Sequence, residues 1–234
     1  MTIFVCMDDT DNLNSRGTGR LARAVAAELA KTYPVRGVTR HQLYVHPDIP
    51  YTSHNSCGVI HINADGYHHL DEIFEIAREE MLNDFIEGSD PGLSVANHEQ
   101  IKPSLIAYGK DAQSKVLTQE NARTMAKNLG IRLEGLGGTE DGVIGSMAGL
   151  GLALTSNDGR FLQIGTIREL VGPQPAQTLL DAGIDDIYTT DGRRVTTGII
   201  WNEEKKSVKP CPVNDQVILF VEEVDGELKA VKRN

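Results

Sequence analysis

The sequence lacks a long apolar run, paired cysteine motifs and an excess of positive charge. No hydrophobic stretch approaches the ~20 residues that a membrane-spanning helix needs, and no basic region precedes the strand-like start TIFVC. We therefore expect neither a membrane span nor a signal peptide. Cys6, Cys57 and Cys211 stand far apart, which argues against a disulfide framework or a structural zinc site. A reducing cytoplasm is the simplest location for such a chain.

Positive charge is scarce as well. The chain has 23 Lys and Arg against 33 Asp and Glu, a formal net charge of −10. This balance does not favour a protein that holds nucleic acid over a broad surface. Binding through a local basic patch is still compatible with this charge, and so is binding through metal ions that bridge acidic side chains to phosphate. Aromatic residues make up 5%, and the single Trp201 with six tyrosines reveals no stacking platform at the sequence level.

What is present is an ordinary globular composition, with 40% hydrophobic residues in 234. Hydrophobic periodicity and Gly/Pro punctuation predict helices over 19–33, 68–86, 118–130, 143–154 and near 175–183. Short apolar segments predict strands over 2–6, 35–46, 57–64, 93–96, 103–109, 161–167, 195–201 and 216–223. The run 64–132 then has the order helix, strand, strand, helix, strand, which suits a small α+β insert of ferredoxin-like type.

Three carboxylates crowd the end of the first predicted strand. Asp8, Asp9 and Asp11 fall within four positions, and such groups repel unless a cation or a basic partner compensates them. Mg²⁺ prefers oxygen ligands and often takes one or two carboxylates plus nucleotide phosphates. Thr10 adds a short polar group that can hold a turn or a water ligand. The alternative is an Asx-rich turn, since Asp, Asn, Ser and Gly are ordinary turn residues.

A helix opens just after these acids. Gly17, Thr18 and Gly19 would offer free backbone amides at its positive dipole end, which is a natural phosphate site. Arg16 and Arg20 could add charge-assisted bonds to phosphate oxygens. Metal-binding acids beside an anion-binding helix end fit a metal–nucleotide complex.

A second glycine-rich loop, 137–142, has the same features. Gly138 and Thr139 could let the backbone approach a ligand closely, and a helix follows. Glu140 and Asp141 would repel phosphate, and could instead bind metal or an amine, or cap the helix. The loop is neither a Walker A motif nor a Rossmann fingerprint, and close helix packing explains its glycines equally well.

Other polar residues suggest less. Four histidines between residues 41 and 61 form no HExxH pair, and we interpret them as scattered surface or half-buried side chains. Arg40 and Asn55 could face the nucleotide from neighbouring strands.

Four ordered segments together resemble a known family, the 2-agmatinylcytidine synthetases that modify an archaeal isoleucine tRNA. The segments are DDTD at 8–11 with a following SRG turn, HPDIP at 46–50 with Asn55 and Gly58 after it, SDPGLSVA at 89–96, and DGVIGSMAGLGL at 141–152. They spread over about 150 residues, which makes the set far more specific than any one motif.

The resemblance implies a fold, a cofactor and a site. Members use ATP to join agmatine to the wobble cytidine of tRNA, through phosphoryl transfer in a kinase-like domain. The implied fold class is α/β (α+β): a catalytic domain formed by 1–63 and 133–234, interrupted by a ferredoxin-like insert at 64–132. The resemblance also places Asp8, Asp9 and Asp11 at the metal–ATP site, with the segment from Gly142 to Gly145 near that site.

Two departures bear on the substrate. The full-length synthetases continue into an OB-type domain and a zinc ribbon that help hold tRNA, and this sequence shows neither. The family's loop also carries a phosphate-accepting threonine in a Cys-Thr-Thr run, whereas Thr18 is the only hydroxyl in the run after Gly17 here.

We therefore expect a cytoplasmic enzyme that uses Mg²⁺ and ATP to activate an oxygen of an unidentified acceptor, with amine ligation afterwards as the resemblance implies. One alternative is a nucleotide-sensing or scaffold protein that kept the fold and lost catalysis. Another is tRNA modification with the missing modules on a separate chain, against which the net charge of −10 counts.

Overall fold

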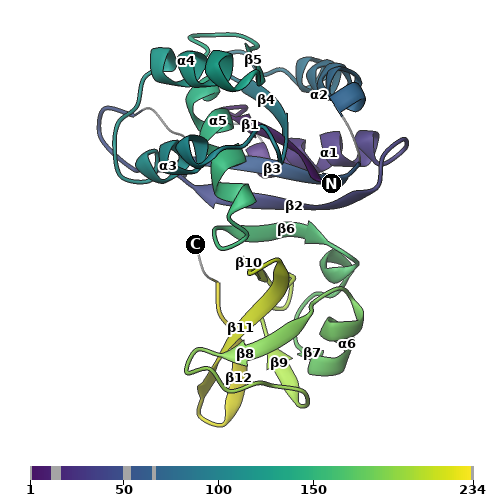
Figure 1. Ribbon diagram of the computed structural model, residues 1–234. Helices are drawn as coiled ribbons and strands as arrows, with labels where there is room; N and C mark the ends of the chain where they lie inside the picture. The colour runs from purple at the N-terminus through teal and green to yellow at the C-terminus, as the bar shows by residue number, and fades with distance from the viewer. Residues whose placement is uncertain (1, 12–16, 50–53, 65–66, 233–234) are drawn as a thin grey trace. The chain divides into compact units, whose positions relative to one another are not determined.

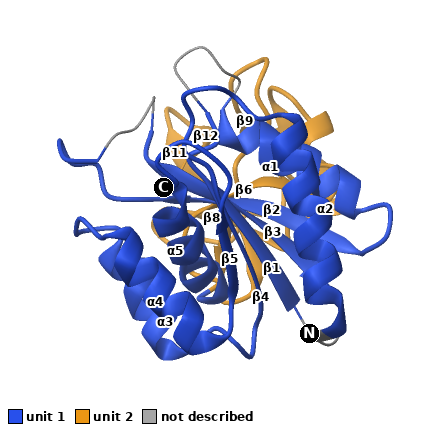
Figure 2. Ribbon diagram, turned by 90° about the horizontal axis from the view of Figure 1, so that it is seen from above, with its two compact units in different colours: residues 1–155 blue, residues 156–234 orange. Residues whose placement is uncertain are grey.

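A computed structural model describes residues 2–11, 17–49, 54–64 and 67–232 (Figure 1). The chain forms two compact units, Met1–Thr155 and Ser156–Asn234 (Figure 2). Within the described residues, no helix combines the length and the apolar character that crossing a membrane requires. The mixed α/β class that the sequence predicts is confirmed.

Unit 1 is built on an antiparallel sheet. Its strands are β1 (Thr2–Asp8), β2 (Val35–Gln42), β3 (Ser56–Asn63), β4 (Gly92–Asn97) and β5 (Arg132–Gly135), in the order β5-β4-β1-β3-β2. The register pairs Asp8 with Gly92 and Met7 with Gly58. β1 is therefore an interior strand, covered on both faces, and this explains why residues 3–8 are buried without alternation. Its carboxyl end carries the acidic residues.

Helices cover both faces of this sheet (Figure 2). On one face lie α1 (Thr18–Leu29) and α2 (Leu70–Asn83), preceded by the 3₁₀ turn η1 (Tyr67–His69); on the other lie α3 (Pro103–Asp111), α4 (Gln119–Leu129) and α5 (Gly142–Leu154). In α1, the apolar residues at i, i+3 and i+4 spacing are the ones buried against the sheet. The predicted amphipathic helix is thus confirmed.

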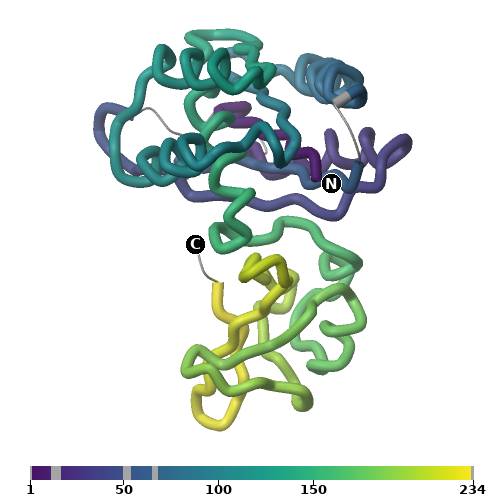
Figure 3. The backbone as a smooth tube through the Cα atoms, viewed as in Figure 1, coloured from purple at the N-terminus to yellow at the C-terminus, as the bar shows by residue number. Residues whose placement is uncertain are grey.

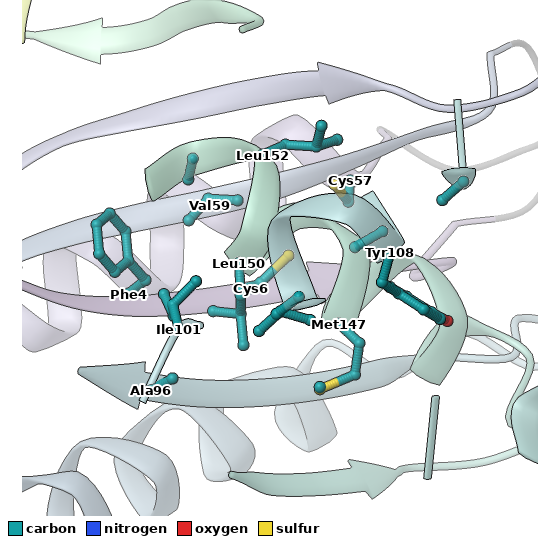
Figure 4. Packing of buried hydrophobic residues seen from close by; sticks show 14 of the residues in the cluster. Phe4, Cys6, Cys57, Val59, Ala96, Ile101, Tyr108, Met147, Leu150 and Leu152 are labelled. Carbon is teal, nitrogen blue, oxygen red and sulfur yellow. The ribbon is translucent and has the colours of Figure 1, made fainter. Parts of the chain in front are cut away.

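α5 is the central helix of the larger core cluster (Figure 4). It is apolar on almost every side, because the sheet contacts one face and α3 and α4 contact the others. Small residues make this burial possible. A Cβ at Gly149 would lie 2.7 Å from Sγ of Cys57, so the helix backbone lies directly on the side chains of the sheet.

Unit 2, the green-to-yellow part of the backbone tube in Figure 3, is smaller than unit 1. It is rich in β-strands and has its own core. Its elements are β6 (Arg160–Ile164), η2 (Ile167–Glu169), β7 (Gln174–Pro175), α6 (Ala176–Asp181), β8 (Asp186–Thr189), β9 (Ile199–Trp201), β10 (Cys211–Val213), β11 (Gln216–Val224) and β12 (Glu227–Ala230). The sheet runs β10-β11-β12-β9-β7, and β8 pairs in parallel with β11. β12 and β9 are parallel neighbours.

One local expectation is corrected. Residues 103–109, predicted as a strand, form α3: Pro103 stands in its first turn, and Leu105 and Tyr108 are buried at helical spacing. A short apolar run fits a strand and a helix equally well. Here the segment packs against α5 along one helical face, which favours the helix. At the start of α4, Thr118 and Asn121 form a reciprocal capping box, with Asn at the position that usually holds Glu or Gln.

The compact units also differ from the expected domain ranges. Residues 64–132 contribute β4, which is hydrogen-bonded to β1 in the interior of the sheet. Unit 1 thus joins 1–63, 64–132 and the segment up to 155 in one body, and the remainder forms unit 2. A ferredoxin-like arrangement within 64–132 stays a prediction.

Candidate functional site

A cavity of about 190 Å³ opens in unit 1 at the carboxyl end of β1. Its walls come from segments that are distant in sequence. The acidic side chains on its lining are those of Asp8, Asp9, Asp11, Asp48 and Asp141; the apolar ones are those of Leu43, Ile49, Ala112, Val116, Leu117 and Ile144. Thr18, His54, Asn55, Ser56, Lys115 and Gly145 complete the described lining. The lining therefore combines five carboxylates with several apolar side chains.

Asp8 lies directly against α5. A Cβ at Gly145 would lie 2.5 Å from Cγ of Asp8 and 2.8 Å from Cδ1 of Leu43, well inside van der Waals contact. Only glycine at this position leaves room for the carboxylate between the helix and the strand. The predicted proximity of Gly145 to the acidic loop is an observed contact, and it explains why a glycine stands there.

Burial changes the acid chemistry of Asp8. Its residue is only 8% exposed, and desolvation together with the charges of Asp9 and Asp11 raises its pKa to about 8, although the backbone N–H of Asp9 opposes this by donating to the carboxylate. A carboxyl with that pKa holds its proton at neutral pH.

Asp9 is under a similar but weaker constraint. It adopts the left-handed backbone region with φ 52°, which turns the chain sharply away from β1. Burial raises its pKa to about 6, with contributions from Asp90, Asp11 and Asp141. The backbone N–H of Asp90 donates to the carbonyl of Asp9 at 3.1 Å, and this bond fixes the two acidic loops side by side. Negative charge from three loops thus converges on one site.

The helix start contributes in part. Thr18, the first residue of α1, lines the cavity, and Gly17 precedes it with φ 83°. Gly19 is half-buried and is not part of the described lining. Arg20 lies outside it as well, with its Nη1 3.9 Å from Oδ2 of Asp84. Arg16 falls outside the described residues.

Thr10, between the acids, is buried at 5% exposure. Its hydroxyl has no hydrogen-bond partner among the described residues. A buried hydroxyl in that state is uncommon in a folded protein.

The second glycine-rich loop supports the site from outside. Gly138 has φ 60°, and the N–H of Thr139 donates to Oδ1 of Asp90 at 2.5 Å. At Gly142, a Cβ would lie 2.6 Å from the carbonyl oxygen of Asp8, so this glycine serves backbone packing. Of the residues predicted in this loop as ligand contacts, neither Gly138, Thr139 nor Gly142 is in the described lining.

The acids of that loop differ in their position. Glu140 pairs with Arg123 at 2.5 Å, away from the cavity lining. Asp141 does line the cavity, and it accepts hydrogen bonds from Nε2 of Gln119 at 2.7 Å and from the hydroxyl of Thr139 at 2.9 Å. These bonds hold the Asp141 carboxylate at the mouth of the site.

Sequence reasoning missed one whole wall. Residues 112–117, between α3 and α4, supply Lys115 and a run of apolar side chains. Lys115 is the one Lys or Arg in the described lining, and its Nζ lies 2.8 Å from Oδ1 of Asp111. Asn55, proposed from the sequence to face a nucleotide, does reach the cavity. Arg40 instead donates to Ser56 at 2.8 Å and is not in the lining.

The acidic side chains do not by themselves form a complete metal centre within the described part of the chain. Among the residues that the structure describes, no group of three or more His, Cys, Asp or Glu side chains converges closely enough to hold an ion by itself. The acidic lining therefore differs from a closed protein cage, in which side chains supply nearly all ligands. It suits an ion that takes one or two carboxylates and completes its shell from elsewhere.

Solved structures share this fold. A tRNA fluorescent labelling enzyme has a TM-score of 0.55 at 22% identity, over 64% of this chain and 36% of that chain. The apo form of TiaS, a tRNA agmatidine synthetase, gives 0.54 at 21% identity, over 64% and 35%. TiaS in complex with its tRNA and ATP gives 0.56 at 22% identity, over 64% and 36%. The match thus spans about a third of these longer proteins.

No family model and no curated protein matches the sequence. The structural likeness therefore establishes a common fold.

Proposed function

We propose that this protein is a Mg²⁺-dependent, ATP-using enzyme that activates an oxygen of its substrate by phosphoryl transfer. The observation that carries the proposal is the cavity at the end of β1, whose lining combines clustered carboxylates with apolar side chains and the start of a helix. The solved structures of similar fold support it, since one is a complex with ATP and another a complex with the ATP analogue AMPCPP and agmatine.

The residues fit a metal–triphosphate group. Asp8 and Asp9 have raised pKa values because burial desolvates them and neighbouring carboxylates add negative charge, and a divalent cation is the natural compensation for such a cluster. Two of Asp8, Asp9 and Asp11 would hold Mg²⁺, and phosphate oxygens would complete its octahedral shell. When bound, the ion supplies charge neutralisation at the transferring phosphoryl group.

The chain's own groups do the positioning. Thr18 begins α1, where free backbone N–H groups and the helix dipole favour a phosphate. Lys115 brings a positive charge to the lining, which suits the developing charge of a transferring phosphoryl group. Leu43, Ile49 and Val116 offer apolar surface that suits the flat face of an adenine ring.

The acceptor and any second reaction step are proposed from the sequence resemblance alone. The sequence motifs resemble those of the agmatinylcytidine synthetases, so amine displacement of the activated group is the second step we propose. A tRNA acceptor belongs to the same proposal.

A second candidate is a catalytically inactive nucleotide-binding protein with a regulatory or scaffold role. One observation favours it: Arg20, predicted as a phosphate contact, lies near Asp84 outside the described lining. Such a protein would bind ATP and never consume it. Sustained nucleotide binding without ADP or AMP formation, across amines, nucleosides and tRNA, would select this candidate.

Isothermal titration with ATP and Mg²⁺ tests the leading proposal. Wild-type protein should bind in the presence of Mg²⁺ and lose most affinity with a chelator. Asp9→Asn should keep the fold and abolish ATP-dependent activity, because it keeps the side-chain volume and removes the charge.

The matched control is Asp225→Asn in the β11–β12 turn. Asp225 has φ 54°, against 52° for Asp9, so the two substitutions have the same chemistry and the same backbone conformation. Absence of nucleotide binding by the wild-type protein would end the proposal.

A further inference from the structure

Unit 2 carries a basic hollow, a name we give to the surface formed by Arg160, Trp201, Lys206, Lys209, Lys229 and Lys232. The hollow has a volume of about 490 Å³, and Glu203 is the one acid in its described lining. Five cations against one acid is a strong local reversal in a chain whose net charge is −10. Folding has thus gathered positive charge that is dispersed in the sequence.

The sheet register explains part of this grouping. β9 and β12 are parallel neighbours, and Trp201 is the register partner of Lys229. Register partners project from the same face of a sheet, so the indole and the ammonium stand side by side. Ile200, one position earlier, is fully buried on the opposite face. The alternation of β9 therefore sends an aromatic ring outward while it keeps the core apolar.

The loop after β9 is held in place by hydrogen bonds to the backbone carbonyl of Lys206. Nδ2 of Asn202 donates to the carbonyl of Lys206 at 2.6 Å, and the N–H of Gly172 donates to the same carbonyl at 3.0 Å. Nζ of Lys209 reaches Oγ of Ser207 at 3.4 Å. The lysines of this loop are thus presented on a fixed backbone.

Ion pairs leave these charges accessible. Nζ of Lys206 lies 2.6 Å from Glu203 and Nζ of Lys229 lies 3.3 Å from Glu227, with lysine side chains 64% and 46% exposed. Solvent-exposed pairs of this kind contribute little stability, so an incoming anion can compete with the glutamates.

Trp201 is the feature that separates this surface from a plain cationic patch. It is the only tryptophan in the chain and is 43% exposed at the edge of the hollow. An exposed indole beside lysines provides a face for stacking together with charges for a backbone.

We infer that the basic hollow binds a single-stranded nucleic acid, with a base stacked on Trp201 and phosphates held by the surrounding lysines. A duplex keeps its bases stacked inside and offers none to the indole. An acidic peptide would pair with the lysines, but it would offer no planar base to stack on the indole ring. The inference concerns unit 2 alone and does not depend on the nucleotide cavity of unit 1.

Tryptophan fluorescence gives a direct test with the full chain. Titration with an oligonucleotide of about 12 unmodified nucleotides, a length within the range that single-strand sites cover, should quench the emission of Trp201. The logarithm of the binding constant should fall with the logarithm of salt concentration, with a slope of about −3 for roughly four phosphates neutralised on a single strand. The unlabelled duplex of the same sequence should bind at least tenfold more weakly.

Substitutions identify the surface. By anisotropy of a labelled oligonucleotide, Trp201→Ala should weaken binding roughly tenfold, and Trp201→Phe should restore part of it because a ring remains. Lys209→Ala and Lys229→Ala should each weaken binding and reduce the salt slope by about 0.7. Lys205→Ala is the matched control: Lys205 is exposed in the same loop and lies outside the described lining, so its loss should have the smaller effect.

Other outcomes would overturn the inference. Equal quenching by inorganic pyrophosphate, independent of strand length, would assign the hollow to small anions. Equal binding of a polyglutamate peptide, or of the duplex, would remove the role of stacking. Absence of quenching would also refute it. The two proposals can fail independently. Asp9→Asn tests the unit 1 proposal through ATP-dependent activity, and it should leave oligonucleotide binding unchanged.

Discussion

Replacement of Asp8 by Asn should change the pH dependence of folding. In the native protein, burial and the charges of Asp9 and Asp11 raise the pKa of Asp8 from 3.8 to about 8, so the folded state holds a proton that the unfolded chain releases. A group that binds its proton more tightly when folded stabilises the fold at low pH and loses this contribution as pH rises. The wild-type free energy of unfolding should therefore decline from about pH 4 to about pH 8 on account of this group.

The magnitude follows from the linkage relation. One pKa unit corresponds to about 1.4 kcal/mol, so the complete change from 3.8 to about 8 is worth roughly 6 kcal/mol. Asn cannot ionise, and its carbonyl can still accept from the N–H of Asp9. The advantage of Asp8→Asn over wild type should grow by about 1.4 kcal/mol per pH unit from pH 5 and level off near pH 8.

Urea unfolding in chelator-containing buffer, at several pH values between about 5 and 9, measures this difference. Far-UV circular dichroism reports on both units, whereas the fluorescence of Trp201 reports on unit 2. An unfolding transition that dichroism detects and Trp201 fluorescence does not detect is assigned to unit 1. Asp9→Asn serves as a comparison, since a pKa of about 6 confines its effect to the range below pH 6. Parallel curves for wild type and Asp8→Asn would refute the reasoning.

Three further predictions concern single side chains. Gly145→Ala should destabilise unit 1 by about 1–3 kcal/mol and weaken ATP binding, because its Cβ would overlap Asp8; unchanged unfolding and unchanged titration would contradict this. Thr118→Ala should cost about 1 kcal/mol in urea unfolding through loss of the capping box with Asn121, and it should leave nucleotide affinity intact. Lys115→Ala should weaken ATP binding about tenfold by calorimetry and leave adenosine binding nearly constant, since the ammonium meets phosphate.

The parts of the site that could be predicted are those that are local in sequence. Asp8, Asp9 and Asp11 follow a strand directly, so their position at its end needs only the strand to be recognised. The periodicity of α1 places Thr18 at a helix start in the same way. Both signals lie within single elements of 7 and 12 residues, the range at which hydrophobic pattern and turn chemistry act.

The rest depends on tertiary packing. Lys115 reaches the cavity because α3 packs on α5, and nothing near residue 115 indicates that contact. Asp90 affects the pKa of Asp9 only because β4 pairs with β1. The glycines of 137–142 have ambiguous roles in sequence, since ligand approach and backbone packing demand the same absence of a side chain; at Gly142 the neighbouring backbone decides for packing.

The bare inner surface of α5 limits how this protein can diverge. Because Gly145 meets Asp8 and Leu43 where a methyl group would stand, the floor of the cavity cannot accept a new side chain there without moving the helix. Variation in what the cavity admits is therefore left to the segments on its rim, around Ile49 and around Val116. Relatives that differ in substrate should keep the floor and change the rim.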